Sequence, residues 1–193
     1  MSHAPRFLAF AGSLRKDSYN KKLVHIAAAA ARAAGADVEF IDLKDYPLPL
    51  YDEDIEKASG IPENAMKLKK LFIAADGFLL ASPEYNSSIS AVLKNTIDWI
   101  TRPVPGEASL AGFMGKSAAL MSASPGALGG LRGLVHIRSI LGNIGVLLLP
   151  DQVAVAKAFE AFNEDGSLKD AKQHASIQNL GTKLAGLASK FKA

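Results

Sequence analysis

The chain has 193 residues, of which 49% are hydrophobic and 21% are charged, and its formal net charge is +3 at pH 7. This length predicts a single domain, residues 1–193, with a substantial core. The absence of cysteine excludes disulfides, thiolate catalysis and cysteine-ligated metal ions. The mild, scattered positive charge argues against nucleic-acid binding and fits a small anionic ligand better.

Neither a membrane segment nor a secretion signal is expected. No apolar run reaches the roughly 20 residues that cross a bilayer, and the first six residues contain no apolar signal core. We therefore expect a cytoplasmic protein without a membrane partner. The histidines, at positions 3, 25, 136 and 174, lack the spacing of metal ligands, so no metal site is expected.

Apolar runs and helix-forming stretches alternate along the whole chain. Short apolar runs predict strands at 6–11, 37–43, 77–82, 116–122 and 146–149, the last continuing past Pro150 as 152–156. Stretches rich in helix formers predict helices at 21–34, 62–75 and 171–191. Two more are predicted between them: one begins at Ile89, and the other follows the glycine-rich stretch and ends at about Asn143. In the helix from Ile89, the apolar stripe leaves Trp99 on nearly the opposite side, where it would serve packing or a subunit interface.

This alternation predicts an α/β fold in which a five-stranded parallel sheet has helices on both faces, giving three layers. The strand order 2-1-3-4-5 is favoured, with the ligand where the order reverses, between strands 1 and 3. The carboxyl ends of parallel strands meet at one edge of the sheet. The loops after strands 1, 3 and 4 are therefore expected to face one another.

The first of these loops, residues 12–20, joins an apolar strand to an alanine-rich helix. Free N–H groups and the helix dipole favour anions at such a point. Arg15 offers a planar fork of donors for phosphate oxygens, and Ser13, Ser18 and Asn20 add polar groups. We interpret the loop as a phosphate site, although Ser18 alone is also explained as a helix N-cap.

The other two loops are less specific. The sequence Pro83-Glu84-Tyr85-Asn86 is explained equally by a simple turn or by contact with a flat heterocycle. Glycines between 126 and 133 would let the backbone approach a flat ligand closely. Two nucleotide motifs are excluded: Gly115-Lys116-Ser117 has Leu110 where a P-loop needs glycine, and 126–133 lacks a G-x-G core.

Three motifs resemble those of the NADPH-dependent FMN reductase family, which includes flavodoxin-like quinone, chromate and azo reductases. They are Gly12-Ser13-Leu14-Arg15-x-x-Ser18-x-Asn20, Pro83-Glu84-Tyr85-Asn86-x-Ser88-Ile89 and Leu93-Lys94-Asn95-x-x-Asp98-Trp99. The resemblance implies a flavodoxin-like fold, bound FMN and a homodimer or homotetramer whose interface uses the helices after the second and third loops. Ser90-Ala91 stands where relatives often have Pro-Gly, which affects a helix start more than the ring-binding loop.

Carried over by position, the resemblance assigns cofactor contacts to residues in all three loops. The phosphate would be held by Ser13, Arg15, Ser18 and Asn20, with Leu14 beside the ribityl chain. The isoalloxazine ring would be bordered by Pro83, Glu84, Tyr85, Asn86 and Ser88. The other side of the site would be closed by Ser122, Ser124, Pro125, Gly126 and Gly129. No protein nucleophile is expected, because the chemistry belongs to the flavin.

The implied activity is two-electron transfer from NADPH or NADH, through FMN, to a small-molecule acceptor. Quinones, azo compounds, chromate and free flavin all remain open as acceptors. A single open flavin face predicts ping-pong kinetics. Two alternatives stay open: a flavodoxin-type electron carrier, although such carriers are usually strongly acidic, and a flavin-binding protein without turnover.

Overall fold

The computed structural model describes residues 4–191. Five parallel strands form one sheet in the order β2-β1-β3-β4-β5, which confirms the predicted order. Neighbouring central strands begin in register, with Phe7 beside Gly77 and Gly77 beside Ser117. The strands are β1 (Arg6–Ala11), β2 (Asp37–Phe40), β3 (Gly77–Ala81), β4 (Ser117–Ala123) and β5 (Leu147–Val155).

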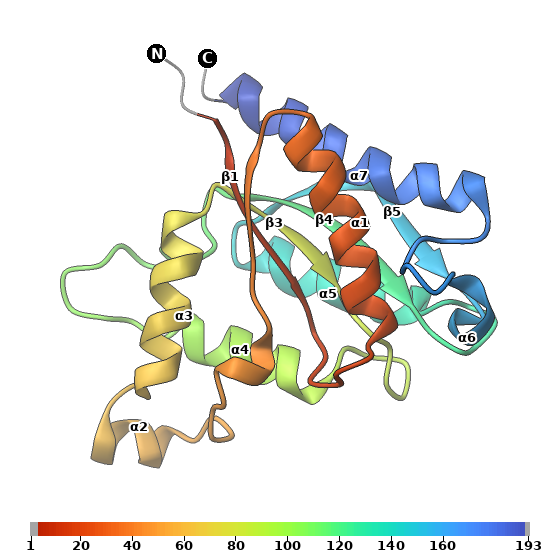
Figure 1. Ribbon diagram of the computed structural model, residues 1–193. Helices are drawn as coiled ribbons and strands as arrows, with labels where there is room; N and C mark the ends of the chain where they lie inside the picture. The colour runs from red at the N-terminus through yellow and green to blue at the C-terminus, as the bar shows by residue number, and fades with distance from the viewer. Residues whose placement is uncertain (1–3, 192–193) are drawn as a thin grey trace.

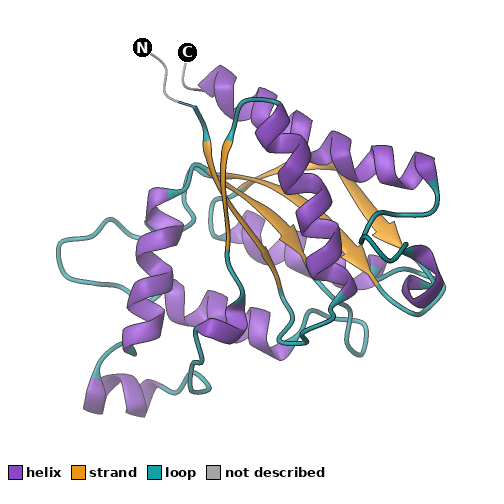
Figure 2. Ribbon diagram, viewed as in Figure 1, coloured by secondary structure: helices purple, strands orange, loops and turns teal. Residues whose placement is uncertain are grey.

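Helices cover both faces of the sheet (Figures 1 and 2), because successive side chains of the central strands point to opposite faces. On one face Phe7 and Ala9 pack against helices α1 (Tyr19–Ala33) and α7 (Ala171–Phe191). On the other, Leu8 and Phe10 pack against three further helices. These are α3 (Glu63–Ala74), α4 (Ala91–Ile100) and α5 (Leu131–Asn143). The result is the three-layer, flavodoxin-like arrangement expected from the sequence.

Several predicted boundaries are wrong by a few residues, each for a local reason. The strand expected to reach residue 43 ends at Phe40, and Asp42 then accepts a hydrogen bond from the N–H of Lys44 to begin a 3-10 turn, η1 (Leu43–Asp45). The helix expected from Ile89 begins at Ala91, because Ser90 is its N-cap. The strand β5 runs through Pro150 without a break, with a shift of register opposite Ala118–Leu120.

Trp99 is fully buried within this chain. Its Nε1 donates to the carbonyl of Pro49 at 2.8 Å, and the edge of Tyr51 lies against its ring, with 5.0 Å between centroids. The packing role is therefore confirmed, and the interface alternative is wrong for this side chain. None of the helices within residues 4–191 combines the length and apolar character needed to cross a membrane.

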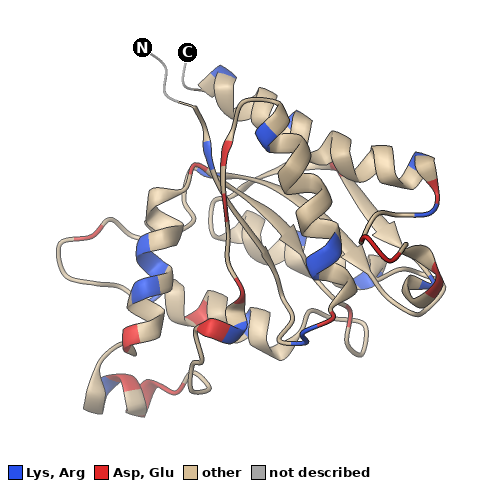
Figure 3. Cartoon of the chain, in the orientation of Figure 1, with Lys and Arg blue, Asp and Glu red and all other residues tan. Residues whose placement is uncertain are grey.

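A short helix, α2 (Glu53–Ser59), was not expected from the sequence; a second one, α6 (Ala158–Ala161), follows β5. Acidic residues gather on α2 and the turn before it, whereas lysines and arginines are spread over the rest of the fold (Figure 3). Glu56 fixes α2 to the domain by accepting from Arg102 Nε at 2.8 Å and from the hydroxyl of Tyr51 at 3.1 Å. The hydrogen bond from Arg102 holds the pKa of Glu56 below its usual value of 4.5.

We expect Glu56→Gln to lower the free energy of unfolding at pH 7 by about 1 kcal/mol, the scale of a partly exposed ion pair. Because the folded-state pKa is depressed, the stabilisation by Glu56 is full above the unfolded pKa and is lost as pH falls through the folded pKa. Urea unfolding of both proteins at pH 7 and in acid measures the difference. If the free energies of unfolding of the wild-type protein and of Glu56→Gln differed by the same amount at pH 7 and well below pH 4, this role of Glu56 would be contradicted.

Candidate functional site

The loops after β1, β3 and β4 meet at the carboxyl edge of the sheet, where they form one cleft. The sheet order explains this arrangement, because β1, β3 and β4 are adjacent and parallel. Residues from all three loops line the cleft: Ser13, Arg15, Ser18, Tyr19, Asn20, Pro83, Glu84, Tyr85, Ala123, Ser124 and Pro125. The predicted meeting of the three loops is thus present in the structure.

The start of α1 forms the first wall of the cleft. Its first N–H groups have no acceptor within the helix, and the side chain of the N-cap residue, Ser18, makes no capping hydrogen bond. The first turn of α1 contains no acidic residue. Ser13 and Ser18 are each 4% exposed, and Arg15 reaches the cleft from the solvent side. Uncapped donors beside a guanidinium are suited to a phosphate group.

Asn20 connects the first and third loops. Its Nδ2 donates to the carbonyl of Ala123, and its Oδ1 accepts from the N–H of Ala123, both at 2.9 Å. Asn20 is buried, so these bonds hold the end of β4 against the start of α1. Only the second N–H of Nδ2 remains for the phosphate contact predicted from the sequence.

The second loop turns sharply. Tyr85 and Ser88 exchange both backbone hydrogen bonds, at 2.9 and 3.0 Å, around Asn86 (φ 49°) and Ser87 (φ 67°). This is the pattern of a type I′ turn. A left-handed backbone costs roughly 1 kcal/mol or more for each residue with a side chain. Contacts elsewhere must therefore hold the turn in place.

Two side chains of this loop contact α5. Glu84 receives hydrogen bonds from the N–H groups of Arg132 and Gly133 and from Arg132 Nε, and Ser88 Oγ lies 2.9 Å from His136 Nδ1. Burial opposes ionisation of Glu84, but these hydrogen bonds and the charge of Arg132 keep the pKa of the carboxyl below its usual value. Glu84 is therefore charged at neutral pH.

The glycines of the third loop are explained by packing within the protein. A Cβ on Gly130 would lie 1.7 Å from Ser122 Oγ, and one on Gly129 would lie 2.7 Å from the backbone of Val155 and Ala156. Ser122 Oγ donates to the carbonyl of Gly129 at 2.7 Å and is buried. We expected these glycines to admit a flat ligand. The close approach of α5 and β5 explains the presence of glycine here without one.

The cleft gathers most, but not all, of the residues predicted to bind a cofactor. Those that do not line it are Leu14, Asn86, Ser88, Ser122, Gly126 and Gly129. Tyr19 and Ala123 line it but were not predicted. Arg132 and His136 were also not singled out, since each contacts a residue 48 positions away. No local pattern in the sequence signals such contacts.

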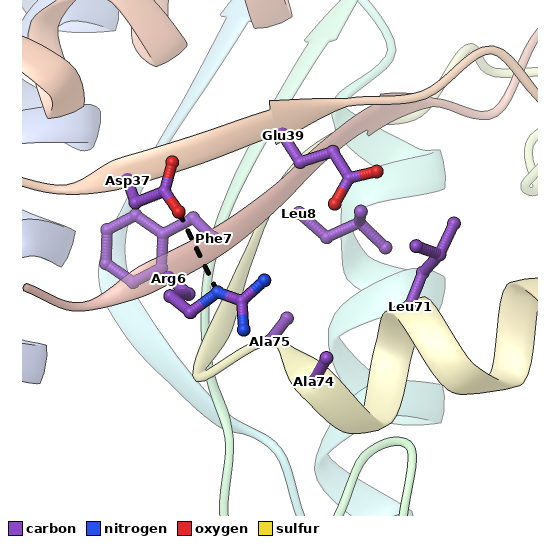
Figure 4. A pocket seen from close by; sticks show the side chains of 8 residues that line it. All are labelled: Arg6, Phe7, Leu8, Asp37, Glu39, Leu71, Ala74 and Ala75. Carbon is purple, nitrogen blue, oxygen red and sulfur yellow. Dashed lines mark ion pairs between the residues drawn. The ribbon is translucent and has the colours of Figure 1, made fainter.

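A small pocket at the opposite edge of the sheet has a different character (Figure 4). It lies at the amino ends of β1 and β2, where Arg6 Nε is 3.7 Å from the carboxylate of Asp37. Leu71 and Ala75 close its other side. Within residues 4–191, which exclude His3, no three His, Asp or Glu side chains are grouped to hold a metal ion.

Comparison with known proteins identifies the family of this chain. The model of the NADPH-dependent FMN reductase family matches residues 5–160. The chain belongs to this family. It is accordingly an oxidoreductase that uses FMN and NAD(P)H, and its fold is that of a solved flavoenzyme.

Individual relatives cover nearly the whole chain. An NAD(P)H-dependent FMN reductase of Pseudomonas aeruginosa is 37% identical over 179 residues, 92% of each chain. An NAD(P)H:quinone oxidoreductase of Solanum tuberosum is 35% identical over 186 residues, covering 94% of this chain and 91% of that protein. Among solved structures, the flavoenzyme NAD(P)H:(acceptor) oxidoreductase FerB of Paracoccus denitrificans has a TM-score of 0.79 and 30% identity, covering 96% of this chain and 98% of its own.

Proposed function

We propose that the cleft binds FMN with its phosphate at the start of α1. The observation that carries this proposal is the uncapped end of α1, where Ser18 makes no capping hydrogen bond and no acidic side chain occupies the first turn. Such a helix end attracts a dianionic phosphate through its N–H groups and its dipole. Ser13, Ser18 and Arg15 supply further donors, and Asn20 holds the wall in place.

The flavin ring would then lie between the second and third loops. Pro83, Glu84 and Tyr85 line one side of the cleft, and Ser124 and Pro125 line the other. Tyr85 is 53% exposed, so it stands at the rim, where an aromatic side chain can lie beside a bound ring. The contacts predicted for Leu14, Asn86, Ser88, Ser122, Gly126 and Gly129 remain proposals.

When bound, FMN supplies the chemistry, by accepting hydride from NAD(P)H and passing two electrons to an acceptor. The protein holds the phosphate, orients the ring and leaves one ring face accessible. The donor and the acceptor then use the same face in turn. Quinones are the acceptors we favour, because relatives that cover most of this chain carry that activity in their names. Azo compounds, chromate and free flavin need no more than the same open face.

An electron carrier that docks to protein partners fits this chain less well. Such carriers are usually strongly acidic, whereas the net charge here is +3. We further propose a cytoplasmic homodimer or homotetramer. The resemblance places α5 at a subunit interface. Exposed apolar side chains lie on this helix, at Leu131 and Val135, and on the loop before it, at Leu128.

Anaerobic addition of NADPH or NADH to the FMN-loaded protein is expected to bleach the flavin absorbance near its visible maximum, and a quinone is expected to restore it. Initial rates at varied NAD(P)H and quinone should give parallel double-reciprocal lines. Intersecting lines would contradict alternating use of one face. Bound FMN that neither nucleotide bleaches would instead indicate a flavin-binding protein without turnover.

A further inference from the structure

Glu84 and Arg132 form an ion pair in the wall of the proposed FMN cleft. The distance from Arg132 Nη2 to Glu84 Oε1 is 2.6 Å, and the Glu84 side chain is 7% exposed, whereas that of Arg132 is 57% exposed. Glu84 itself lines the cleft. Glu84 therefore places a negative charge beside the space assigned to the flavin ring, and Arg132 places a positive charge directly against that carboxylate.

The same carboxylate completes the start of α5. The N-cap residue of this helix is Gly130, which has no side chain to cap it, and the first turn of α5 holds no acidic residue. Glu84 Oε2 accepts from the N–H groups of Arg132 and Gly133, at 3.0 and 3.2 Å. The carboxylate of Glu84, which belongs to the second loop, thus caps the N-terminus of α5 in place of a local side chain.

The hydrogen bonds that the Glu84 carboxylate accepts therefore come from α5. The carboxylate receives donors from the backbone and from the guanidinium, and it has little exposed surface left. One helical turn further along α5, His136 contacts Ser88 at the end of the type I′ turn. These two contacts bracket the left-handed residues Asn86 and Ser87 and offset the strain of that turn.

We propose that Glu84 and Arg132 are positioning residues that also balance charge beside FMN, and so set its reduction potential. This proposal rests on the proposed binding of FMN in the cleft. A carboxylate near the ring disfavours the negative charge that reduction adds, and a guanidinium favours it. In the intact pair the two effects oppose each other, while the shared hydrogen bonds hold the loop against α5.

Single substitutions that remove one charge are expected to move the midpoint potential of bound FMN in opposite directions. Glu84→Gln leaves Arg132 uncompensated and raises the potential; Arg132→Gln leaves Glu84 uncompensated and lowers it. We expect each shift to reflect about a tenfold change in the relative affinity for reduced and oxidised FMN, or about 30 mV for a two-electron couple. The double variant Glu84→Gln/Arg132→Gln should return close to the wild-type value.

An anaerobic spectroscopic redox titration of each FMN-loaded protein against a reference dye makes the measurement. Arg132→Lys keeps the charge but loses the planar fork, so its potential should stay near wild type even if its FMN affinity falls. Asp151→Asn, which breaks the exposed pair with Lys183, is the matched control and should change neither quantity. If Glu84→Gln does not fold, the contrast between Arg132→Gln and Arg132→Lys still decides the question.

Shifts of the same sign in both single variants, or equal shifts in Arg132→Gln and Arg132→Lys, would overturn the charge-balancing role and leave the pair as a structural contact. These outcomes differ from failure of the proposed function. A wild-type protein that does not bind FMN contradicts the assignment of the cleft, whereas bound FMN with unshifted potentials contradicts this inference alone.

Discussion

Replacing Arg15 and Ser18 together with alanine is expected to weaken FMN binding by at least about a hundredfold, because each side chain offers a hydrogen bond to a charged phosphate worth about 1.5–3 kcal/mol. Both residues line the cleft at the start of α1. The helix itself should remain intact, since Ser18 makes no capping hydrogen bond that the substitution would remove. Quenching of FMN fluorescence on addition of FMN-free protein measures the dissociation constant.

Arg6→Ala is a matched control for loss of a guanidinium. Arg6 lies at the opposite edge of the sheet, and its Nε is 3.7 Å from an exposed carboxylate of Asp37 (Figure 4). Its removal should leave the affinity for FMN unchanged. If the Arg15/Ser18 double variant bound FMN as tightly as the Arg6 variant, the phosphate would have to lie elsewhere.

The second large effect is expected for the contact between α1 and α7. A Cβ on Gly181 would lie 2.1 Å from the carbonyl oxygen of Ala27, a backbone atom that cannot move without shifting α1. We expect Gly181→Ala to lower the free energy of unfolding by about 3 kcal/mol, the upper range for overpacking a core. The FMN affinity should also fall, because the proposed phosphate site lies at the start of α1.

Gly186 provides the control within the same helix. No atom lies within 4 Å of the position a Cβ would take there. Gly186→Ala should therefore raise the free energy of unfolding by up to about 1 kcal/mol through helix propensity alone. Denaturant unfolding of both variants measures the contrast. Equal effects at the two positions would mean that α1 and α7 do not pack as closely as the structure has them.

The fold was predictable from the sequence because its dominant signal is repetitive. Apolar strands alternate with long helical stretches, and a parallel sheet leaves few possible orders. Helix α7 was predicted with the same bounds, 171–191, and its start follows Asp170, which accepts from the N–H groups of Lys172 and Gln173 at 2.8 and 2.9 Å. Boundaries failed where one side chain ends an element, as Asp42 does after β2 and Ser90 does before α4.

The short helix α2 was missed because it buries no residue of its own. No periodic apolar face marks it in the sequence. It is held by a cluster distant in the chain, in which Arg102 contacts Glu56 and lies 5.1 Å from the ring centroid of Tyr51. Such a contact depends on the finished fold, so composition and spacing do not reveal it.

The three loops were predictable as a group, but the role of each residue was not. The loop after a strand is visible in the sequence, whereas the partner of a given side chain depends on the packing around it. The hydroxyl of Ser122 donates to the carbonyl of Gly129, and the side-chain amide of Asn20 makes two hydrogen bonds to the backbone of Ala123. The pairing of Glu84 with Arg132 joins residues 48 positions apart and has no local signature.

The departure from the family pattern at Ser90-Ala91 also has a structural meaning. Ser90 Oγ accepts from the N–H of Leu93 to cap α4 and donates to the carbonyl of Gly12 at 2.6 Å. A Cβ on Gly12 would lie 3.0 Å from Leu93, so the first loop rests closely on the start of α4. The serine therefore joins the first loop to the helix that follows the second loop.

The binding of the cofactor phosphate at the start of α1 is tested most directly by comparing FMN with riboflavin, which has the same ring and ribityl chain but no phosphate. FMN-free protein titrated with each should bind FMN at least about a hundredfold more tightly than riboflavin, from the loss of charge-assisted hydrogen bonds. Equal affinity for the two, or no binding of FMN, would contradict the assignment of the uncapped helix end to the phosphate.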